Sequence, residues 1–145
     1  MKLNSAAREL IGSGVDDAML ITLNRDGSPQ ATMTWMALRT NADGDDELVA
    51  GHLAEHQKVR NVRRDPRVVV SIPSHDKSGA MEPYLVVKGT ARIVEGGAPE
   101  FLRPLAKEFV GPDATWPPAD APGGYLTVVR IDQVGGVGAW ADRDA

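Results

Sequence analysis

Two tight-turn signals near the start of the chain constrain its fold more than any other feature. Asp26-Gly27 separates the apolar run Ala18–Leu23 from a second run, Gln30–Arg39. Asp43-Gly44 separates that second run from Glu47–Gly51. Asp-Gly pairs between apolar runs are typical of hairpins, because glycine adopts the positive φ that a tight turn requires. The sequence therefore predicts an antiparallel meander rather than a βαβ fold.

The rest of the chain adds further strands and short helices. Runs rich in β-branched residues predict strands at 67–72, 84–94 and 125–131. Helical spacing of apolar residues predicts helices at 4–11, 52–64 and 99–110. Gly89 predicts a bulge or bend, and the tail Gly135–Trp140 is expected to be irregular. Many antiparallel strands with few helices predict a mainly β fold, a small closed or nearly closed barrel.

Both faces of the predicted strand Gln30–Arg39 are apolar. Met33 and Trp35 share one parity, and Met36 and Leu38 share the other. A strand that is apolar on both sides is expected to be covered on both. A lone barrel of this size leaves such a strand partly open, so the pattern also favours a homodimer.

Composition excludes several classes of function. The length of 145 residues fits one domain, 1–145. The absence of cysteine excludes disulfides, thiolate zinc sites, iron–sulfur clusters and a cysteine nucleophile. A net charge of -4 argues against a nucleic-acid partner, and no apolar run approaches the roughly 20 residues of a membrane span. We therefore expect a cytoplasmic protein that binds neither nucleic acid nor membrane.

Residues 52–56, His-Leu-Ala-Glu-His, match the inverted zinc-protease pattern H-x-x-E-H. On a helix, two imidazoles one turn apart suit zinc. The pattern also needs a distant third ligand and a mostly helical scaffold. Its place after a strand, with basic residues following, fits anion binding better, so we predict no metal site and rank a zinc hydrolase last.

A basic stretch follows in a chain that is acidic overall. It comprises Lys58, Arg60, Arg63, Arg64 and Arg67, opposed only by Asp65. One interpretation is a solvated helix face. The other is a phosphate site formed by Lys58 and the strand-to-helix turn, because a helix N-terminus offers free N–H groups and positive potential.

Several segments together resemble a known family. They are Asp-Gly-Ser-Pro-Gln at 26–30, the Trp35 strand, the Lys-x-x-Asn-x-x-Arg-Asp-Pro-Arg-Val core at 58–68, Val-Lys-Gly-Thr-Ala at 87–91, and Gly-x-Gly-x-Trp at 136–140. The chain resembles the pyridoxamine-phosphate-oxidase-like split β-barrels over about residues 5 to 140. Within them it is most similar to actinobacterial oxidoreductases that use the deazaflavin F420.

The resemblance implies a six-stranded antiparallel split barrel that forms a homodimer, with two cofactor sites at the interface. It implies that Lys58 binds the cofactor phosphate, and that His56 stands where close relatives often carry arginine. Gly138 and Trp140 are expected from the partner subunit. The full set of implied cofactor-binding residues is Thr32, Met33, Thr34, Trp35, Met36, Gly51, His52, His56, Lys58, Asn61, Gly138 and Trp140.

The function implied is hydride transfer from reduced F420 to an unsaturated small-molecule substrate. No catalytic side chain is predicted, because the cofactor ring carries the chemistry and the protein supplies orientation and shielding. Two alternatives stay open on the same fold. One is an FMN-dependent oxidoreductase, and the other is a non-catalytic flavin- or deazaflavin-binding protein.

Overall fold

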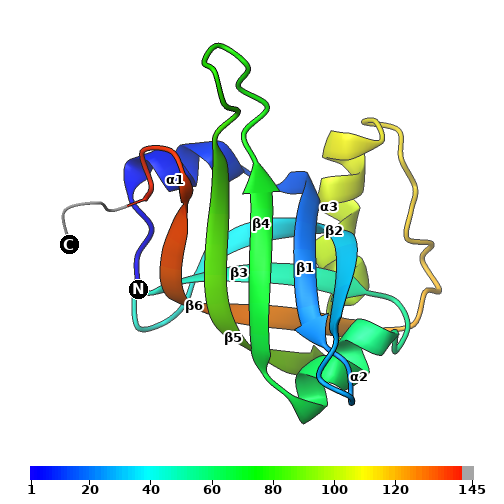
Figure 1. Cartoon of the computed structure of the whole chain (residues 1–145). Helices are drawn as coiled ribbons and strands as arrows, with labels where there is room; N and C mark the ends of the chain where they lie inside the picture. The colour runs from blue at the N-terminus through cyan, green and yellow to red at the C-terminus, as the bar shows by residue number, and fades with distance from the viewer. Residues whose placement is uncertain (142–145) are drawn as a thin grey trace.

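The computed structural model describes residues 1–141, which form a closed antiparallel barrel of six strands with three short helices (Figure 1). Residues 142–145 of the predicted domain lie outside the described residues. Around the barrel the order is β1-β2-β3-β6-β5-β4. The strands are β1 (Val15–Leu23), β2 (Pro29–Thr40), β3 (Asp46–His52), β4 (Arg67–Pro73), β5 (Tyr84–Glu95) and β6 (Tyr125–Val137). The helices are α1 (Ser5–Ile11), α2 (Gln57–Arg64) and α3 (Ala98–Phe109). The predicted mainly β, antiparallel barrel is confirmed.

Glycines form the two predicted hairpin turns and the predicted bulge. Gly27 and Gly44 adopt φ of 85° and 84°, in the left-handed region that favours glycine. The β5–β6 register shifts between Lys88 and Gly89, and a Cβ on Gly89 would lie 2.4 Å from the carbonyl oxygen of Arg130. These three positions of the sequence were therefore interpreted correctly.

Two predicted boundaries are wrong. The helix expected from His52 begins at Gln57, because β3 continues through His52, which pairs with Tyr125 of β6. The tail expected to be irregular from Gly135 is strand as far as Val137, because Gly135 pairs with Val86 of β5. In both places a sheet neighbour distant in sequence satisfies the backbone, and local composition does not report such a neighbour.

The main core fills the barrel, and helices cover its two ends. Figure 1 shows α1 at one end and α2 at the other. Ala7 and Ile11 of α1 and Val62 of α2 join the core cluster with barrel residues such as Leu20 and Val87. No described helix is long and apolar enough to span a membrane.

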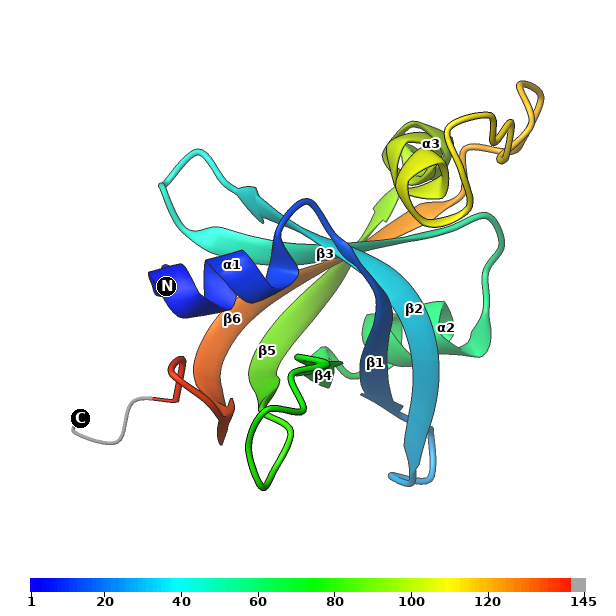
Figure 2. The ribbon, with the colours of Figure 1, turned by 90° about the horizontal axis from the view of Figure 1, so that it is seen from above.

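Helix α3 lies outside the barrel, where it packs on β3 (Figure 2). A Cβ on Gly51 would lie 2.9 Å from the ring of Phe101 and 3.1 Å from Leu102. The close approach of α3 to this strand therefore depends on glycine at position 51.

Strand β2 parts from β3 halfway along its length. It pairs with β1 from Pro29 to Met36, but its pairing with β3 covers Ala37–Thr40. The edge of residues 30–36 that faces away from β1 is therefore not paired with β3. Within the closed barrel, this parting leaves one edge of β2 open, and α2 begins beside it.

The outward side of β2 is not covered throughout, as expected for a lone barrel. Met33 is 61% exposed, whereas Met36 on the inward side is fully buried. Trp35 packs edge-on against Phe109 of α3 and Trp116, with ring centroids 5.4 and 5.8 Å apart. A single chain therefore covers Trp35 in part and leaves Met33 open.

A buried carboxylate ties the N-terminal segment to the barrel. Asp46 accepts hydrogen bonds from the backbone N–H of Leu3 at 2.8 Å, the hydroxyl of Thr40 at 3.1 Å, and the guanidinium of Arg8. Burial works to raise the pKa of Asp46, but these hydrogen bonds outweigh it and hold the pKa below its usual value.

We expect Asp46→Ala to lower the free energy of unfolding by about 2 kcal/mol, because it leaves the Leu3 N–H unsatisfied and Arg8 without its partner. Chemical denaturation measures this change. Asp45→Ala is the matched control, because Asp45 is exposed and, within residues 1–141, its one ion pair is a 3.4 Å contact with the N-terminal amine. Equal stability losses in the two variants would show that Asp46 has no anchoring role.

Candidate functional site

A cleft of about 390 Å³ lies where β2 parts from β3 and α2 begins. It is lined by Gln30, Thr32, His56, Gln57 and Lys58. The sequence analysis named Thr32, His56 and Lys58, and the structure brings them together. It did not name Gln30 or Gln57. Gln30 ends the 26–30 motif, which was the only sequence signal that pointed to it.

Lys58 is the most unusual charge of this cleft. It is half-buried, and burial lowers the pKa of its ammonium group from the usual lysine value. No salt bridge joins it to a carboxylate anywhere in residues 1–141. A partly desolvated cation without an acidic partner is stabilised by an incoming anion.

The start of α2 adds backbone donors beside Lys58. The helix begins after His56, whose side chain makes no capping hydrogen bond, and its first turn contains no acidic residue. The first N–H groups of a helix have no partner within the helix and carry positive potential. The cleft therefore combines an ammonium group, a hydroxyl, amides and free backbone N–H groups, a set suited to an oxyanion.

The predicted β2 residues divide between two sides of the strand. Thr32 faces the cleft, and Thr34 lies on the same inward side, half-buried. Met33 and Trp35 lie on the outward side, and Met36 is within the core. The feature that residues 32–36 share is the backbone edge not paired with β3.

Other predicted residues lie away from the cleft lining. Gly51 packs under α3, and Asn61 is fully buried with hydrogen bonds to β1 and α2. Trp140 joins the core of its own chain and donates its indole N–H to the Tyr84 carbonyl at 2.8 Å. Gly138 lies against the Trp140 ring, so that a Cβ would be 2.4 Å from it. The expectation that Gly138 and Trp140 complete a partner's site stays a prediction.

His52 is buried behind the cleft, and its Nε2 lies 2.8 Å from the Thr127 hydroxyl. Its ring centroid is 6.5 Å from that of His56. Residues 52–56 are not helical, so the H-x-x-E-H spacing does not place two ligands on one helix face. Within the described residues, no group of three or more His, Asp or Glu side chains is placed to hold a metal ion.

His52 should make stability depend on pH. Burial above all, and then the charges of Lys58 and His56, lowers the pKa of His52 to about 3. Well above pH 6.5 the residue is neutral in both the folded and the unfolded chain; as pH falls from there toward 3, the unfolded chain gains the proton and the folded chain does not. From pH 7 to pH 5 this should cost about 2 kcal/mol of stability.

Between pH 7 and pH 5, the free energy of unfolding should fall by about 2 kcal/mol less in His52→Gln than in the wild type, because the variant removes that proton uptake. Urea unfolding at pH 7 and pH 5 gives the difference directly, and the carboxylates common to both proteins cancel. Identical pH dependence in the two proteins would contradict the assignment.

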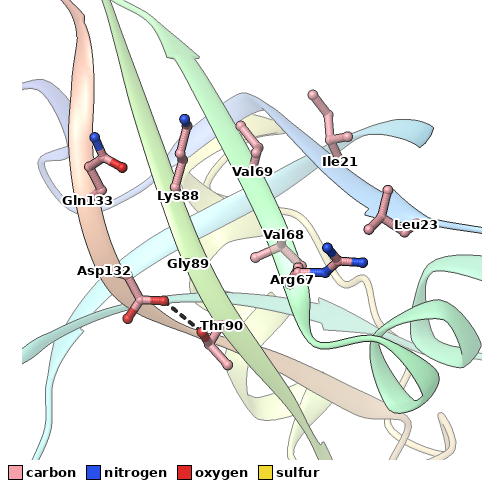
Figure 3. Close-up of a pocket in the computed structure, with 10 residues that line it drawn as sticks. All are labelled: Ile21, Leu23, Arg67, Val68, Val69, Lys88, Gly89, Thr90, Asp132 and Gln133. Atoms are coloured by element: carbon pink, nitrogen blue, oxygen red, sulfur yellow. Dashed lines mark hydrogen bonds between the residues drawn. The ribbon is translucent and has the colours of Figure 1, made fainter. Parts of the chain in front are cut away.

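A second groove, of about 410 Å³, lies on the outer face of the barrel across β1, β4, β5 and β6 (Figure 3). Ile21, Leu23 and Val69 contribute apolar surface, and Lys88 lies beside them. Arg67 at its rim is already bound by the Asp65 carboxylate at 2.7 Å. The outer groove has apolar side chains in its lining, whereas the cleft at Lys58 is lined by polar and charged side chains, so the cleft is the better anion site.

Comparison with known proteins agrees with this architecture. The profile of the family described as "Pyridoxamine 5'-phosphate oxidase" matches residues 8–135. No curated protein sequence matches the chain significantly.

Solved structures match nearly the whole chain. One described as an F420 reductase is 29% identical, covers 88% of this chain and 94% of its own, and has a TM-score of 0.69. A putative pyridoxamine 5'-phosphate oxidase from Listeria innocua is 20% identical, with 91% and 95% coverage and a TM-score of 0.63. An FMN-binding protein from Syntrophomonas wolfei is 16% identical, with 91% and 84% coverage and a TM-score of 0.63. The last two likenesses show the fold alone.

Proposed function

The chain belongs to the pyridoxamine 5'-phosphate oxidase family, and we propose that it is an oxidoreductase that uses F420 to reduce an unsaturated small molecule. The observation that carries this proposal is the half-buried Lys58, which has no acidic partner in residues 1–141 and lies in a cleft of hydrogen-bond donors. The 29% identity to an F420 reductase supports the choice of cofactor.

The residues of the cleft fit the ribityl phosphate that F420 and FMN share. Lys58, Thr32 and the free N–H groups of α2 offer positive charge and donors to its oxygens. The open edge of β2 offers backbone groups along the length of a flat ring. When bound, such a cofactor supplies the hydride chemistry, and the protein binds it, orients it and shields it from water.

Arg60 gives a physical reason to favour F420, whose tail carries glutamate carboxylates. Its guanidinium donates to the Glu55 carbonyl at 2.8 Å and to Gln57 at 2.9 Å, and no described carboxylate forms a salt bridge with it. Arg60 is therefore an exposed cation beside the cleft wall. FMN has no such tail and gains nothing from this residue.

We expect the purified protein to bind F420 more tightly than FMN, and Lys58→Ala to weaken F420 binding about ten- to a hundredfold, because it removes a charge-assisted phosphate contact. Fluorescence titration gives both dissociation constants. Lys107→Ala, an exposed lysine of α3, is the matched control and should bind like the wild type.

Three results would revise this proposal. Tighter binding of FMN would assign the FMN-dependent alternative. Binding of F420 without turnover of reduced F420 against a panel of conjugated substrates would indicate a non-catalytic carrier. Binding unaffected by Lys58→Ala would remove the cleft from the cofactor site.

The proposed assembly is a homodimer formed through the outer face of β2, β1 and β4. On this face the apolar residues lie opposite one another across the strands: Met33 pairs with Met19, and Ile21 pairs with Ala31 and Val69. The patch is apolar, and Met33 at its edge is 61% exposed. Contiguous apolar surface of this kind marks protein interfaces.

We expect a dimer by sedimentation at micromolar concentration, and Met33→Glu to shift it to monomer, because two carboxylates would be buried at the interface. Met81→Glu is the matched control: Met81 is 62% exposed but lies in the β4–β5 loop that projects from the barrel (Figure 1). A wild-type monomer, or a dimer indifferent to Met33→Glu, would exclude this face.

A further inference from the structure

A chain of hydrogen bonds runs beneath the cleft and ends at Gln30. It begins at Arg60 and Arg64 of α2 and passes through Gln57 and the buried side chain of Asn61. It then crosses to β1 and β2, through Thr22, Asn24 and Gln30. Thr22 and Asn61 are both fully buried, so their polar groups have to be satisfied inside the protein.

The two arginines determine which way the amides of this chain point. A guanidinium only donates hydrogen bonds, so the amide atom that faces it must be oxygen. Arg60 therefore fixes Oε1 of Gln57 at 2.9 Å, and Arg64 fixes Oδ1 of Asn61 at 3.3 Å. Nε2 of Gln57 then donates to the same Asn61 oxygen at 2.8 Å.

The polarity continues to Gln30. With its oxygen on the α2 side, Asn61 turns its amide nitrogen toward β1, where it donates to the Thr22 hydroxyl at 3.0 Å and to Asn24 at 2.9 Å. The Thr22 hydroxyl in turn donates its own proton to Oε1 of Gln30 at 3.3 Å. Asn61 lies 3.5 Å from the same oxygen. Nε2 of Gln30 is thus left with no bonded acceptor in the described chain.

We propose that Gln30 binds an oxyanion in the cleft through its Nε2 hydrogens, and that Asn61 and Thr22 are positioning residues that keep this amide turned as a donor. The proposal rests on the proposed function and specifies the oxyanion as the phosphate of the bound cofactor. A glutamine that rotates freely offers oxygen as readily as N–H, and its oxygen repels phosphate. The network removes the repulsive orientation.

The test compares ligands that differ only in the phosphate. The probes are the 5'-phosphate of the deazaflavin core, which lacks the glutamate tail of F420, and FMN; the phosphate-free deazaflavin core and riboflavin are their respective controls. The deazaflavin pair or the flavin pair is used, whichever the wild type binds. Gln30→Met should weaken binding of the phosphate-bearing ligand about tenfold, because one charge-assisted hydrogen bond is lost. The phosphate-free ligand should bind as before. Gln30→Glu, which replaces the donors by a carboxylate, should weaken the phosphate-bearing ligand further.

A second variant tests the positioning role. Thr22→Val keeps the volume of Thr22 but removes the proton that holds Oε1 of Gln30. It should weaken binding of the phosphate-bearing ligand about threefold alone and cause no further loss in the Gln30→Met background, because coupled residues are non-additive. Losses of the same size in both backgrounds would show that Thr22 acts on structure in general.

The outcomes separate this inference from the function on which it rests. If Lys58→Ala weakens the phosphate-bearing ligand and neither Gln30 variant does, the proposed function stands and Gln30 does not bind the phosphate. If the Gln30 variants weaken the phosphate-free ligand equally, Gln30 contacts another part of the cofactor and the proposal is overturned. If neither the Lys58 nor the Gln30 variants change binding, both proposals fall. Thermal unfolding of each variant confirms that a folded protein was titrated.

Discussion

The parting of β2 from β3 is the constraint on which the site depends. Residues 37–40 of β2 pair with β3, and the N-terminal part of the strand pairs with β1 alone. The space so opened admits the start of α2 with Lys58. It also exposes polar groups next to the core, which the Asn61 network satisfies. A barrel in which β2 and β3 paired throughout would have neither the cleft nor the network.

The same place carries an electrostatic cost. Lys58 is partly desolvated without an acidic partner in the described chain, and His52 behind it is kept neutral by burial and by the neighbouring charges. Both pKa values are lowered, because the environment disfavours positive charge. A bound anion would reduce this electrostatic cost. Perturbed groups gathered at a cleft are typical of functional sites, and here burial without a partner charge is their common cause.

The sequence predicted the parts of the fold that depend on neighbouring residues. The Asp-Gly turns, the presence of each strand and the Gly89 bulge are local signals, and all three were predicted correctly. The helix start at His52 was wrong because its pairing with Tyr125 is a contact between segments distant in sequence. The open side of Met33 was expected for a lone barrel, but the sequence of one chain does not report what covers it.

Within the site, Lys58, Thr32 and His56 were named through a motif and a family resemblance, both of which are readable in sequence. Gln30 and Gln57 were missed for a physical reason. Glutamines in a turn-flanking strand and a basic helix are unremarkable until tertiary contacts join them. The polarity of their amides depends on Arg60 and Arg64, whose partners only the folded chain defines.

The register of one hairpin assigns the two sides of β2 to different tasks. Gln30 pairs with the buried Thr22, and Met33 pairs with Met19 on the outward side. Side chains alternate along a strand with a period of two, so a slip of one residue would turn the cleft residues outward and the apolar ones inward. The turn at Gly27, with its φ of 85°, fixes that register. The turn that first indicated a meander therefore also places the cleft on one side of β2 and the proposed subunit contact on the other.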